Sequence, residues 1–114
     1  MMTTTVPRYS APKGITVPQL IEAVEPIHDW VHSRSRNRRI RYIMAVLIHI
    51  DMKDGEEYTL HGLCDRVQKY NPIGNNAMSL TRQRLSSFFA QLIKLGVLGK
   101  TERKSKTYYY KVIK

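Results

Sequence analysis

The stretch TRQRLSSFFAQLIKLGVLGKTERKSKTYYYKV, residues 81–112, changes its hydrophobic period at Gly96. Before this glycine the large apolar residues follow the spacing of one helix face: Leu85, Phe88, Phe89, Leu92 and Leu95. Thr81 is a residue type that caps the start of a helix, and glycine is a frequent residue at a helix end. After the glycine, strand-forming residues lie on both sides of a polar centre. The stretch therefore predicts a helix over residues 81–95 and a β-hairpin over residues 97–113.

Cations and tyrosines lie side by side in this hairpin. The cations surround Lys104-Ser105, where we expect the turn, so they would occupy a solvent-exposed tip. Alternation along the second strand divides its residues between two faces, with Tyr108, Tyr110 and Val112 opposite Tyr109, Lys111 and Ile113. We expect Tyr108 and Tyr110 to pack their rings on the core at the root of the hairpin, and Tyr109 to face outward.

Two helices are predicted in the first half of the chain. Residues 17–32 carry apolar side chains at helical spacing, and Pro26 should kink or split that helix near Glu25. Residues 40–51 are apolar on most sides, so we expect them to form a helix at the centre of the core. Gly55 supplies the turn after it.

Shorter signals complete the pattern. Tyr58 is a candidate for a very short strand, and Thr59 is a candidate cap for a third helix. The buried face of that helix would comprise Leu60, Leu63, Cys64 and Val67. Residues 71–80 have the composition of a loop, and residues 1–15 have that of a disordered N-terminal arm.

The stretch SLTRQRLSSFFAQLIKLGVLGKTERKSKTYYYKV resembles the second half of a winged helix-turn-helix domain. In that superfamily the recognition helix begins at a hydroxyl cap, buries apolar residues at fixed intervals and ends in a small-residue turn before two apolar strand residues. The matching residues here are Thr81, Leu85, Phe89, Leu92, Gly96, Val97 and Leu98. The resemblance covers about residues 40–113, although the connection 71–80 is longer than the usual short turn. It implies a mainly α fold with a small β-hairpin: one winged helix-turn-helix domain over residues 16–114, with an extra N-terminal helix over 17–32.

The charge of the chain is strongly positive and unevenly placed. The formal net charge is +10, from 19 Lys and Arg against 9 Asp and Glu. Residues 34–50 contain five Arg and no acid, and residues 72–114 contain nine cations and one acid. An excess of this size favours a polyanionic partner, with nucleic acid ahead of an anionic membrane surface. No apolar run approaches the ~18 residues of a membrane span.

The predicted helix 81–95 has the residues of a DNA-reading surface. From Asn71 to Thr101 there is no Asp or Glu, which fits a surface that lies against phosphates. With the apolar face turned inward, the residues expected to face the major groove are Arg82, Gln83, Arg84, Ser86 and Ser87. The first two are candidates for base contacts, because Arg pairs bidentately with guanine and Gln with adenine. The resemblance implies that the hairpin tip contacts the DNA backbone or minor groove through Arg103, Lys104 and Lys106.

A second cationic block precedes the central helix: Arg34, Arg36, Arg38, Arg39 and Arg41. Cations are disfavoured at a helix start by the helix dipole, so an external benefit is expected. Phosphate contact is the first interpretation, with Arg36, Arg38 and Arg39 as candidate DNA-binding residues. Pairing with acids of the same or a partner chain is the second: Glu22, Glu25 or Asp29. A nuclear-import signal is the third.

Other kinds of site have little support in the sequence. The single cysteine, Cys64, lies on an apolar stripe, so it reads as a small buried hydrophobe and forms no intrachain disulfide. His28 and His32 are four residues apart but lack further ligands, which favours surface histidines over a metal site. No nucleotide loop or catalytic motif is present, so we expect no enzyme, no cofactor and no small-molecule effector.

The sequence therefore favours a transcriptional regulator that binds specific double-stranded DNA, located in the cytoplasm on the nucleoid or in a nucleus. A homodimer through the N-terminal helix is expected, because two-fold DNA sites favour dimers. Three alternatives stay open. One is a DNA-binding component of a replication, partition or recombination assembly. Another is an RNA-binding winged helix that stacks bases on residues 108–110, and the last is a module that binds an acidic protein surface.

Overall fold

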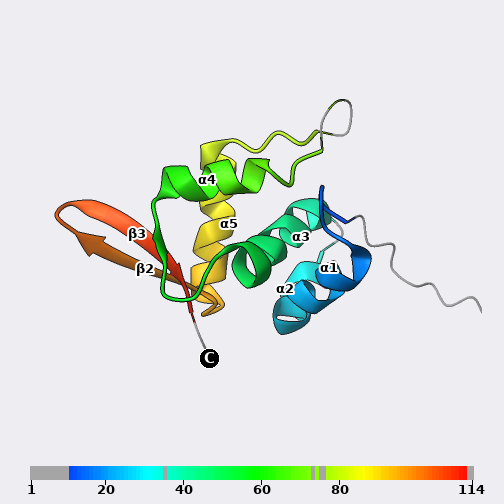
Figure 1. Ribbon diagram of the computed structural model, residues 1–114, viewed down its shortest axis with the longest axis horizontal. Helices are drawn as coiled ribbons and strands as arrows, with labels where there is room; N and C mark the ends of the chain where they lie inside the picture. Colours follow the sequence, from blue (N-terminus) through cyan, green and yellow to red (C-terminus); the bar gives the residue numbers. More distant parts are fainter. Residues whose placement is uncertain (1–10, 35, 73, 75–76, 113–114) are drawn as a thin grey trace, which may run out of the picture.

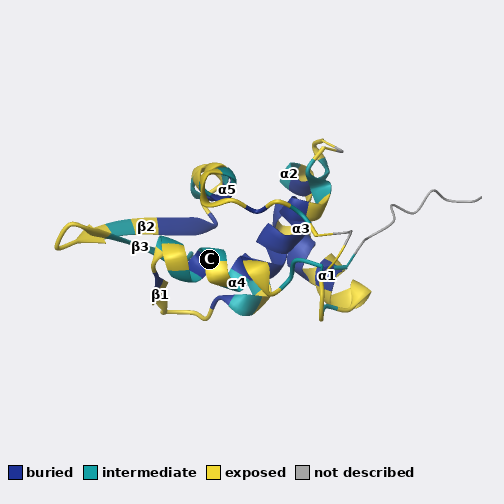
Figure 2. Ribbon diagram, turned by 90° about the horizontal axis from the view of Figure 1, so that it is seen from above, coloured by how far each residue is buried: buried dark blue, intermediate teal, exposed yellow. Residues whose placement is uncertain are grey.

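One strongly apolar helix, α3 (Arg38–Val46), lies at the centre of the computed structural model, which describes residues 11–34, 36–72, 74 and 77–112. The helix continues into a π-helical turn, η2 (Leu47–Asp51). Every residue from Ile40 to Ile48 is buried, and Figure 2 shows this helix as the most buried element. The predicted central helix is therefore confirmed. Its position follows from the side chains buried on all sides of it from Ile40 to Ile48, while Arg39 in its first turn is exposed.

The N-terminal segment folds as two short helices joined at Pro26. Helix α1 (Val17–Val24) starts with a capping box, in which Thr16 and Gln19 satisfy each other's backbone N–H groups. A 3₁₀ turn, η1 (Glu25–Ile27), then leads into α2 (His28–His32). The predicted break near Glu25 is confirmed, because proline cannot donate the hydrogen bond that would continue the helix. The apolar face of this segment is buried in the same hydrophobic cluster as α3 and the later helices: Leu20, Val24, Ile27 and Val31.

The other two helices begin at the predicted threonines. Helix α4 (Leu60–Gln68) is capped by Thr59, whose side-chain oxygen accepts from the Gly62 N–H. Helix α5 (Arg82–Lys94) is capped by Thr81, whose oxygen accepts from the Arg84 N–H. The residues of α5 that are buried are the predicted ones: Leu85, Phe88, Phe89 and Leu92. Leu95 is the exception, because it is 40% exposed at the end of the helix.

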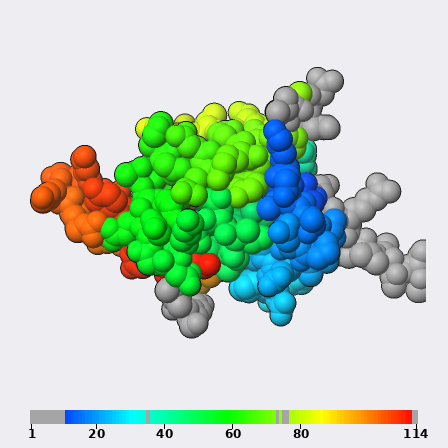
Figure 3. Space-filling view, in the orientation of Figure 1, coloured from blue at the N-terminus to red at the C-terminus, as the bar shows by residue number. Residues whose placement is uncertain are grey.

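The sheet has three antiparallel strands in the order β1–β3–β2, formed by β1 (Glu57–Tyr58), β2 (Leu98–Arg103) and β3 (Lys106–Lys111). The hairpin of β2 and β3 projects from the helices, as Figures 1 and 3 show. We call its outer half, residues 101–108, the wing. Its two-residue turn is Lys104-Ser105, as predicted, with φ of 52° and 65°. The structure is mainly helical with a small sheet, which confirms the coarse fold prediction.

The prediction for the tyrosine faces is wrong. Tyr109 lies opposite both Tyr58 and Lys100 in the register, and its ring centroid is 6.2 Å from that of Phe89 in the core. Tyr110 instead covers Gly99 from the outer face, where an added Cβ would lie 2.2 Å from the Tyr110 ring. The cause is the position of β1 in the sheet. Its buried Tyr58 pairs with Tyr109 of β3, and this pairing sets which face of β3 turns inward.

The predicted N-terminal arm needs a correction at its C-terminal end. Residues 1–10 lie outside the described residues, but residues 11–15 are packed on the fold. Pro12 is buried, and Ala11 and Ile15 lie against the core. The Lys13 N–H also donates to the Tyr70 carbonyl oxygen at 3.3 Å. Within the described part of the chain, every helix is too short or too polar to span a bilayer.

Candidate nucleic-acid interface

The outward side of α5 is a ridge of four exposed residues: Gln83, Ser87, Ala90 and Lys94. They recur at intervals of three and four residues, so they lie on one line along the helix, opposite the buried leucines and phenylalanines. We call this line the α5 ridge. It carries one cation and no acid, and its middle residues have short side chains. A backbone or base edge can therefore approach the helix closely along it.

Arg82, a predicted base-contacting residue, is exposed beside α4 at the start of α5. One of its Nη atoms is 3.1 Å from His61 Nδ1, and His61 Nε2 is 3.3 Å from an Asp65 carboxylate oxygen. A neutral His61 with its proton on Nε2 accepts from the arginine and donates to the aspartate. This chain of contacts orients the guanidinium, and Asp65 balances part of its charge.

Arg84, predicted to face the major groove, lies instead on the flank of α5 that faces α3. Its two Nη atoms donate to Asn37 Oδ1 at 2.8 Å and to the Ser79 carbonyl oxygen at 3.0 Å. The residue is half-buried. The same flank holds Gln91, whose Oε1 accepts from the Trp30 indole N–H at 2.9 Å. Arg84 is therefore outside the α5 ridge, and it joins the start of α5 to the start of α3.

The two predicted serines differ in exposure. Ser87 is exposed in the middle of the α5 ridge, whereas Ser86 is half-buried on the flank toward α4. Their difference follows from the helix period, because a step of one residue turns the side chain by about 100°. Ser87 is therefore the better placed of the two to meet a ligand.

Of the predicted wing residues, Arg103 already has partners within the chain. It forms a two-pronged ion pair with Glu57 of β1 and lies over the Tyr108 ring, with its Cζ 4.8 Å from the ring centroid. The carboxylate raises the pKa of this guanidinium further above its usual value. Lys104 and Lys106 are exposed at the tip, so they are the wing cations that point into solvent.

The arginine run divides between structural and surface residues. Arg41 is 8% exposed, donates to the Trp30 carbonyl oxygen and to Ser33 Oγ, and lies over the Trp30 ring. It therefore fastens α2 to α3. Arg34, Arg36 and Arg39 are exposed and Arg38 is half-buried, so this part of the run extends the cationic surface beyond α5.

The remaining titratable candidates lie near arginines of this surface, Cys64 beside Arg82 and His32 near Arg38. Cys64 is half-buried rather than fully buried as predicted, and burial raises its pKa. The rings of His28 and His32 are 4.5 Å apart, and burial, followed by its neighbours His28 and Arg38, lowers the pKa of His32. No group of three or more metal-ligating side chains occurs in the residues that the structure describes.

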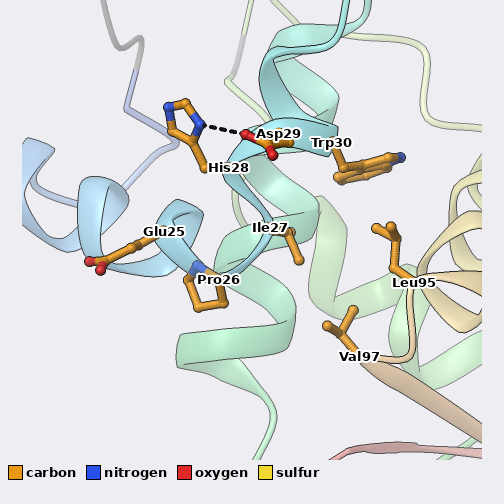
Figure 4. Close-up of a pocket in the computed structure, with 8 residues that line it drawn as sticks. All are labelled: Glu25, Pro26, Ile27, His28, Asp29, Trp30, Leu95 and Val97. Atoms are coloured by element: carbon orange, nitrogen blue, oxygen red, sulfur yellow. Dashed lines mark hydrogen bonds and ion pairs between the residues drawn. The ribbon is translucent and has the colours of Figure 1, made fainter.

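A hollow of about 240 Å³ lies between α2 and the end of α5. Figure 4 shows Ile27, Leu95 and Val97 pointing toward one another across it, while Glu25 and His28 point away. Its floor is therefore apolar, and the carboxylates at its rim are Glu25 and Asp29. This chemistry does not suit a polyanion, so the hollow limits the cationic surface on this side.

Several partners of the interface residues are invisible in the sequence pattern. Asn37, His61 and Glu57 lie 47, 21 and 46 residues from the arginines they contact. Asn is a frequent residue at the N-cap, and Asn37 directly precedes α3. Its side chain nevertheless accepts a hydrogen bond from Arg84 and does not cap its own helix. Comparison with known proteins adds no site residue, because no protein-family model, curated protein or solved structure matches this chain.

Proposed function

We propose that this chain is a winged helix-turn-helix protein that binds specific double-stranded DNA and regulates transcription. The order of elements supports the proposal: helix α3, strand β1, helices α4 and α5, and then the β2–β3 hairpin. In this assignment α5 is the recognition helix, and the outer half of the hairpin is the wing that contacts DNA beside it. The N-terminal helices are an addition that completes the core.

The α5 ridge is the observation that carries the proposal. A helix of 13 residues is about 20 Å long, and the major groove of B-DNA is wide enough to admit it. The ridge offers an amide, a hydroxyl and an ammonium group without an opposing acid. A solvated helix face usually carries both signs of charge, so this composition favours contact with phosphates and base edges.

The geometry assigns different roles to the residues predicted from the sequence. Gln83 and Arg82, at the start of α5, are proposed to read base edges, and Ser87 and Lys94 to contact the backbone along the groove. Lys104 and Lys106 are proposed to hold a neighbouring stretch of backbone. Arg84 is left out of the groove-facing group in this proposal, because its guanidinium donates to Asn37 and to the Ser79 carbonyl oxygen on the flank of α5.

Selection of bound duplexes from a random pool, at near-physiological salt, tests the proposal directly. We expect one enriched sequence with affinity at least about a thousandfold above that for random duplex. A flat selection with no enriched sequence would contradict specific DNA binding. The symmetry of the enriched site separates a regulator, which favours two related half-sites, from a component of a replication or partition assembly.

Matched variants then distinguish residues that recognise the base sequence from residues that only bind the DNA backbone. Gln83→Ala should reduce discrimination between the selected site and its single-base variants, by about tenfold at one position. Lys104→Ala should weaken every duplex alike and lower the salt dependence of log Kobs by about 0.9. Lys53→Gln removes one charge at an exposed position outside this surface, so it serves as the control and should change neither quantity.

A second candidate function is suggested by the outer face of the sheet. Tyr110 is 37% exposed there, and Tyr108 lies beside it under Arg103. Exposed aromatic rings of this kind stack on unpaired bases. Direct titration with single-stranded RNA tests this second function, since binding at the outer face requires the exposed tyrosine rings. Tyr110→Ala should then weaken RNA binding and leave duplex binding unchanged.

The homodimer is a separate proposal. The apolar residues of the predicted N-terminal helix face are buried within the chain: Leu20, Val24, Ile27 and Val31. A second chain would instead contact Val17 and Ile21, which are 43% and 47% exposed on α1. Sedimentation of the Ile21→Lys variant beside the wild type tests it, and a monomeric wild type would rule it out.

A further inference from the structure

Three arginines from two elements surround one hollow on the surface, which we call the arginine hollow. It has a volume of about 270 Å³ and is lined by Asn37, Arg38, Arg39, Ile40, Met78 and Arg84. The first four lining residues are the cap and first turn of α3, and Arg84 comes from the start of α5. None of the lining residues is an acid. Three like charges therefore converge on a space equal to roughly nine water molecules at ~30 Å³ each.

The fold positions Arg84 without neutralising it. Both of its hydrogen-bond acceptors, the Asn37 side chain and the Ser79 carbonyl group, are uncharged. This contrasts with Arg103, which is paired with a carboxylate. The half-buried guanidinium therefore keeps its full charge at the edge of the hollow and has a fixed orientation, which favours a ligand that accepts hydrogen bonds and carries negative charge.

Arg38 and the start of α3 point to the same chemistry. Arg38 Nε is buried and has no hydrogen-bond partner among the described residues, a costly state for a charged donor. Asn37 has a left-handed backbone, with φ of 64°, and gives α3 no side-chain cap. The first N–H groups of a helix that lacks a cap are free to bind an anion. A single tetrahedral anion in the hollow would accept from the exposed part of the Arg38 guanidinium and from the backbone N–H groups at the start of α3.

We propose that the arginine hollow binds one phosphate group. Arg38 and Arg39 approach it from α3 and Arg84 from α5, and the start of α3 adds backbone N–H groups. The phosphate can be a diester of bound duplex DNA, in which case the inference rests on the proposed function. It can also belong to a free phosphorylated compound, in which case the inference stands without it.

The first arm of the test uses inorganic phosphate alone. Amide and guanidinium NMR signals of the wild-type chain are followed during a phosphate titration, with sodium chloride at matched ionic strength as the reference. We expect saturable shifts at Arg38, Arg39, Ile40 and Arg84. The double variant Arg38→Gln/Arg39→Gln should weaken this binding at least about tenfold, whereas the control Lys53→Gln should leave it unchanged. If the double variant and the Lys53→Gln control bound phosphate equally well, the binding would be adventitious attraction to a basic protein, and the proposal would be overturned.

The second arm uses the selected duplex with one phosphate at a time replaced by a neutral methylphosphonate. For the wild type, one position should reduce affinity by about tenfold. The double variant should lose clearly less affinity than the wild type at that position, because two of the three arginines that contact that phosphate are already absent. Additive losses at every position, together with no saturable phosphate binding in the first arm, would overturn the proposal.

The two arms also separate this inference from the proposed function. Saturable phosphate binding without coupling to any duplex position identifies the ligand as a free phosphorylated compound and supports the site. Failure of the wild type to bind any duplex contradicts the proposed function, and the phosphate titration then decides the arginine hollow by itself. Thermal unfolding of the double variant checks its folding, and Arg39→Gln alone, at an exposed residue, replaces it if the double variant unfolds.

Discussion

The two ends of the central helix treat charge in opposite ways. At the C-terminal end, the Asp51 carboxylate accepts from Arg66 at 2.8 Å, from Lys69 at 2.9 Å and from Tyr70 at 2.6 Å. At the N-terminal end, the arginine hollow gathers three cations from two elements and lines them with no acid. The comparison distinguishes charges that are paired with one another inside the fold from cations that line a hollow without an acid.

The state of Asp51 shows the first kind of charge. Its side chain is only 7% exposed. Burial raises the pKa of this carboxyl, but hydrogen bonds from Tyr70, Lys69 and Arg66 outweigh burial and bring the pKa below its usual value. Burial and the same carboxylate raise the pKa of the Tyr70 hydroxyl. Asp51 is therefore an ionised link that fastens the end of α3 and η2 to α4.

The largest effect should follow from Asp51→Asn. The change removes the charge-assisted hydrogen bonds that Asp51 accepts from Arg66, Lys69 and Tyr70 at a side chain only 7% exposed, and should lower the free energy of unfolding by about 3 kcal/mol. Urea denaturation at pH 7 measures it. Asp54→Asn, at an exposed aspartate near Lys111, is the matched control and should cost less than about 0.5 kcal/mol. Equal costs at both positions would contradict the role of Asp51 as a structural link.

The next largest effect should come from Arg41→Met, within the arginine run itself. Methionine keeps much of the buried volume but removes two hydrogen bonds and the contact with the Trp30 ring. We expect a loss of about 2 kcal/mol in unfolding free energy, with duplex affinity unchanged below the melting temperature. Arg39→Met, at an exposed position, should show the reverse pattern. A salt-dependence change in the Arg41 variant would contradict this division of the run.

A third prediction uses pH to isolate the Asp51 link. The folded-state pKa of Asp51 is lowered from its model-peptide value of 3.8, so its contribution to stability is full above that value and is lost as pH falls through the lower folded-state pKa. The stability gap between wild type and Asp51→Asn should therefore be constant from pH 7 to pH 5 and narrow below about pH 4. Urea curves at each pH measure the gap, and a gap that stays constant to pH 2.5 would refute the assignment.

Much of the fold follows from local sequence signals. The spacing of Leu85, Phe89 and Leu92 predicts the buried face of α5, and the threonine caps and the break at Pro26 are local in the same sense. The turn at Lys104-Ser105 follows from the change of period on either side of it. These signals work because each depends on residues within one or two helical turns, or within one hairpin.

The errors have the opposite character, because each depends on a partner far away in the sequence. Three consecutive tyrosines have no alternation, so only the pairing of Tyr58 with Tyr109 decides which ring turns inward. Arg84 fits the pattern of an outward residue until Asn37, 47 residues earlier, binds it. The Asp51 link joins residues that are 15 to 19 positions apart. No periodicity along one element carries this information.

The smallest expected effect concerns the tip of the wing, where exposed lysines lie next to a strained two-residue turn. Lys104 and Ser105 both have left-handed backbone angles, which cost a residue with a Cβ roughly 1 kcal/mol and which glycine adopts freely. Ser105→Gly should therefore raise the free energy of unfolding by about 0.5–1 kcal/mol while leaving every cation in place.

Because Ser105→Gly keeps both tip lysines, its affinity for duplex and its salt dependence should match those of the wild type. Lys104→Ala should show the converse, with weaker binding of all duplexes and little gain in stability, because alanine keeps a Cβ at a left-handed residue. Urea denaturation and a salt series of duplex titrations on the two variants measure both quantities. If Ser105→Gly weakened binding as much as Lys104→Ala, the rigid turn itself would be what presents the wing to the duplex. The tip would then act through its shape, and the cations that matter for duplex affinity would be those at the N-terminal end of α3.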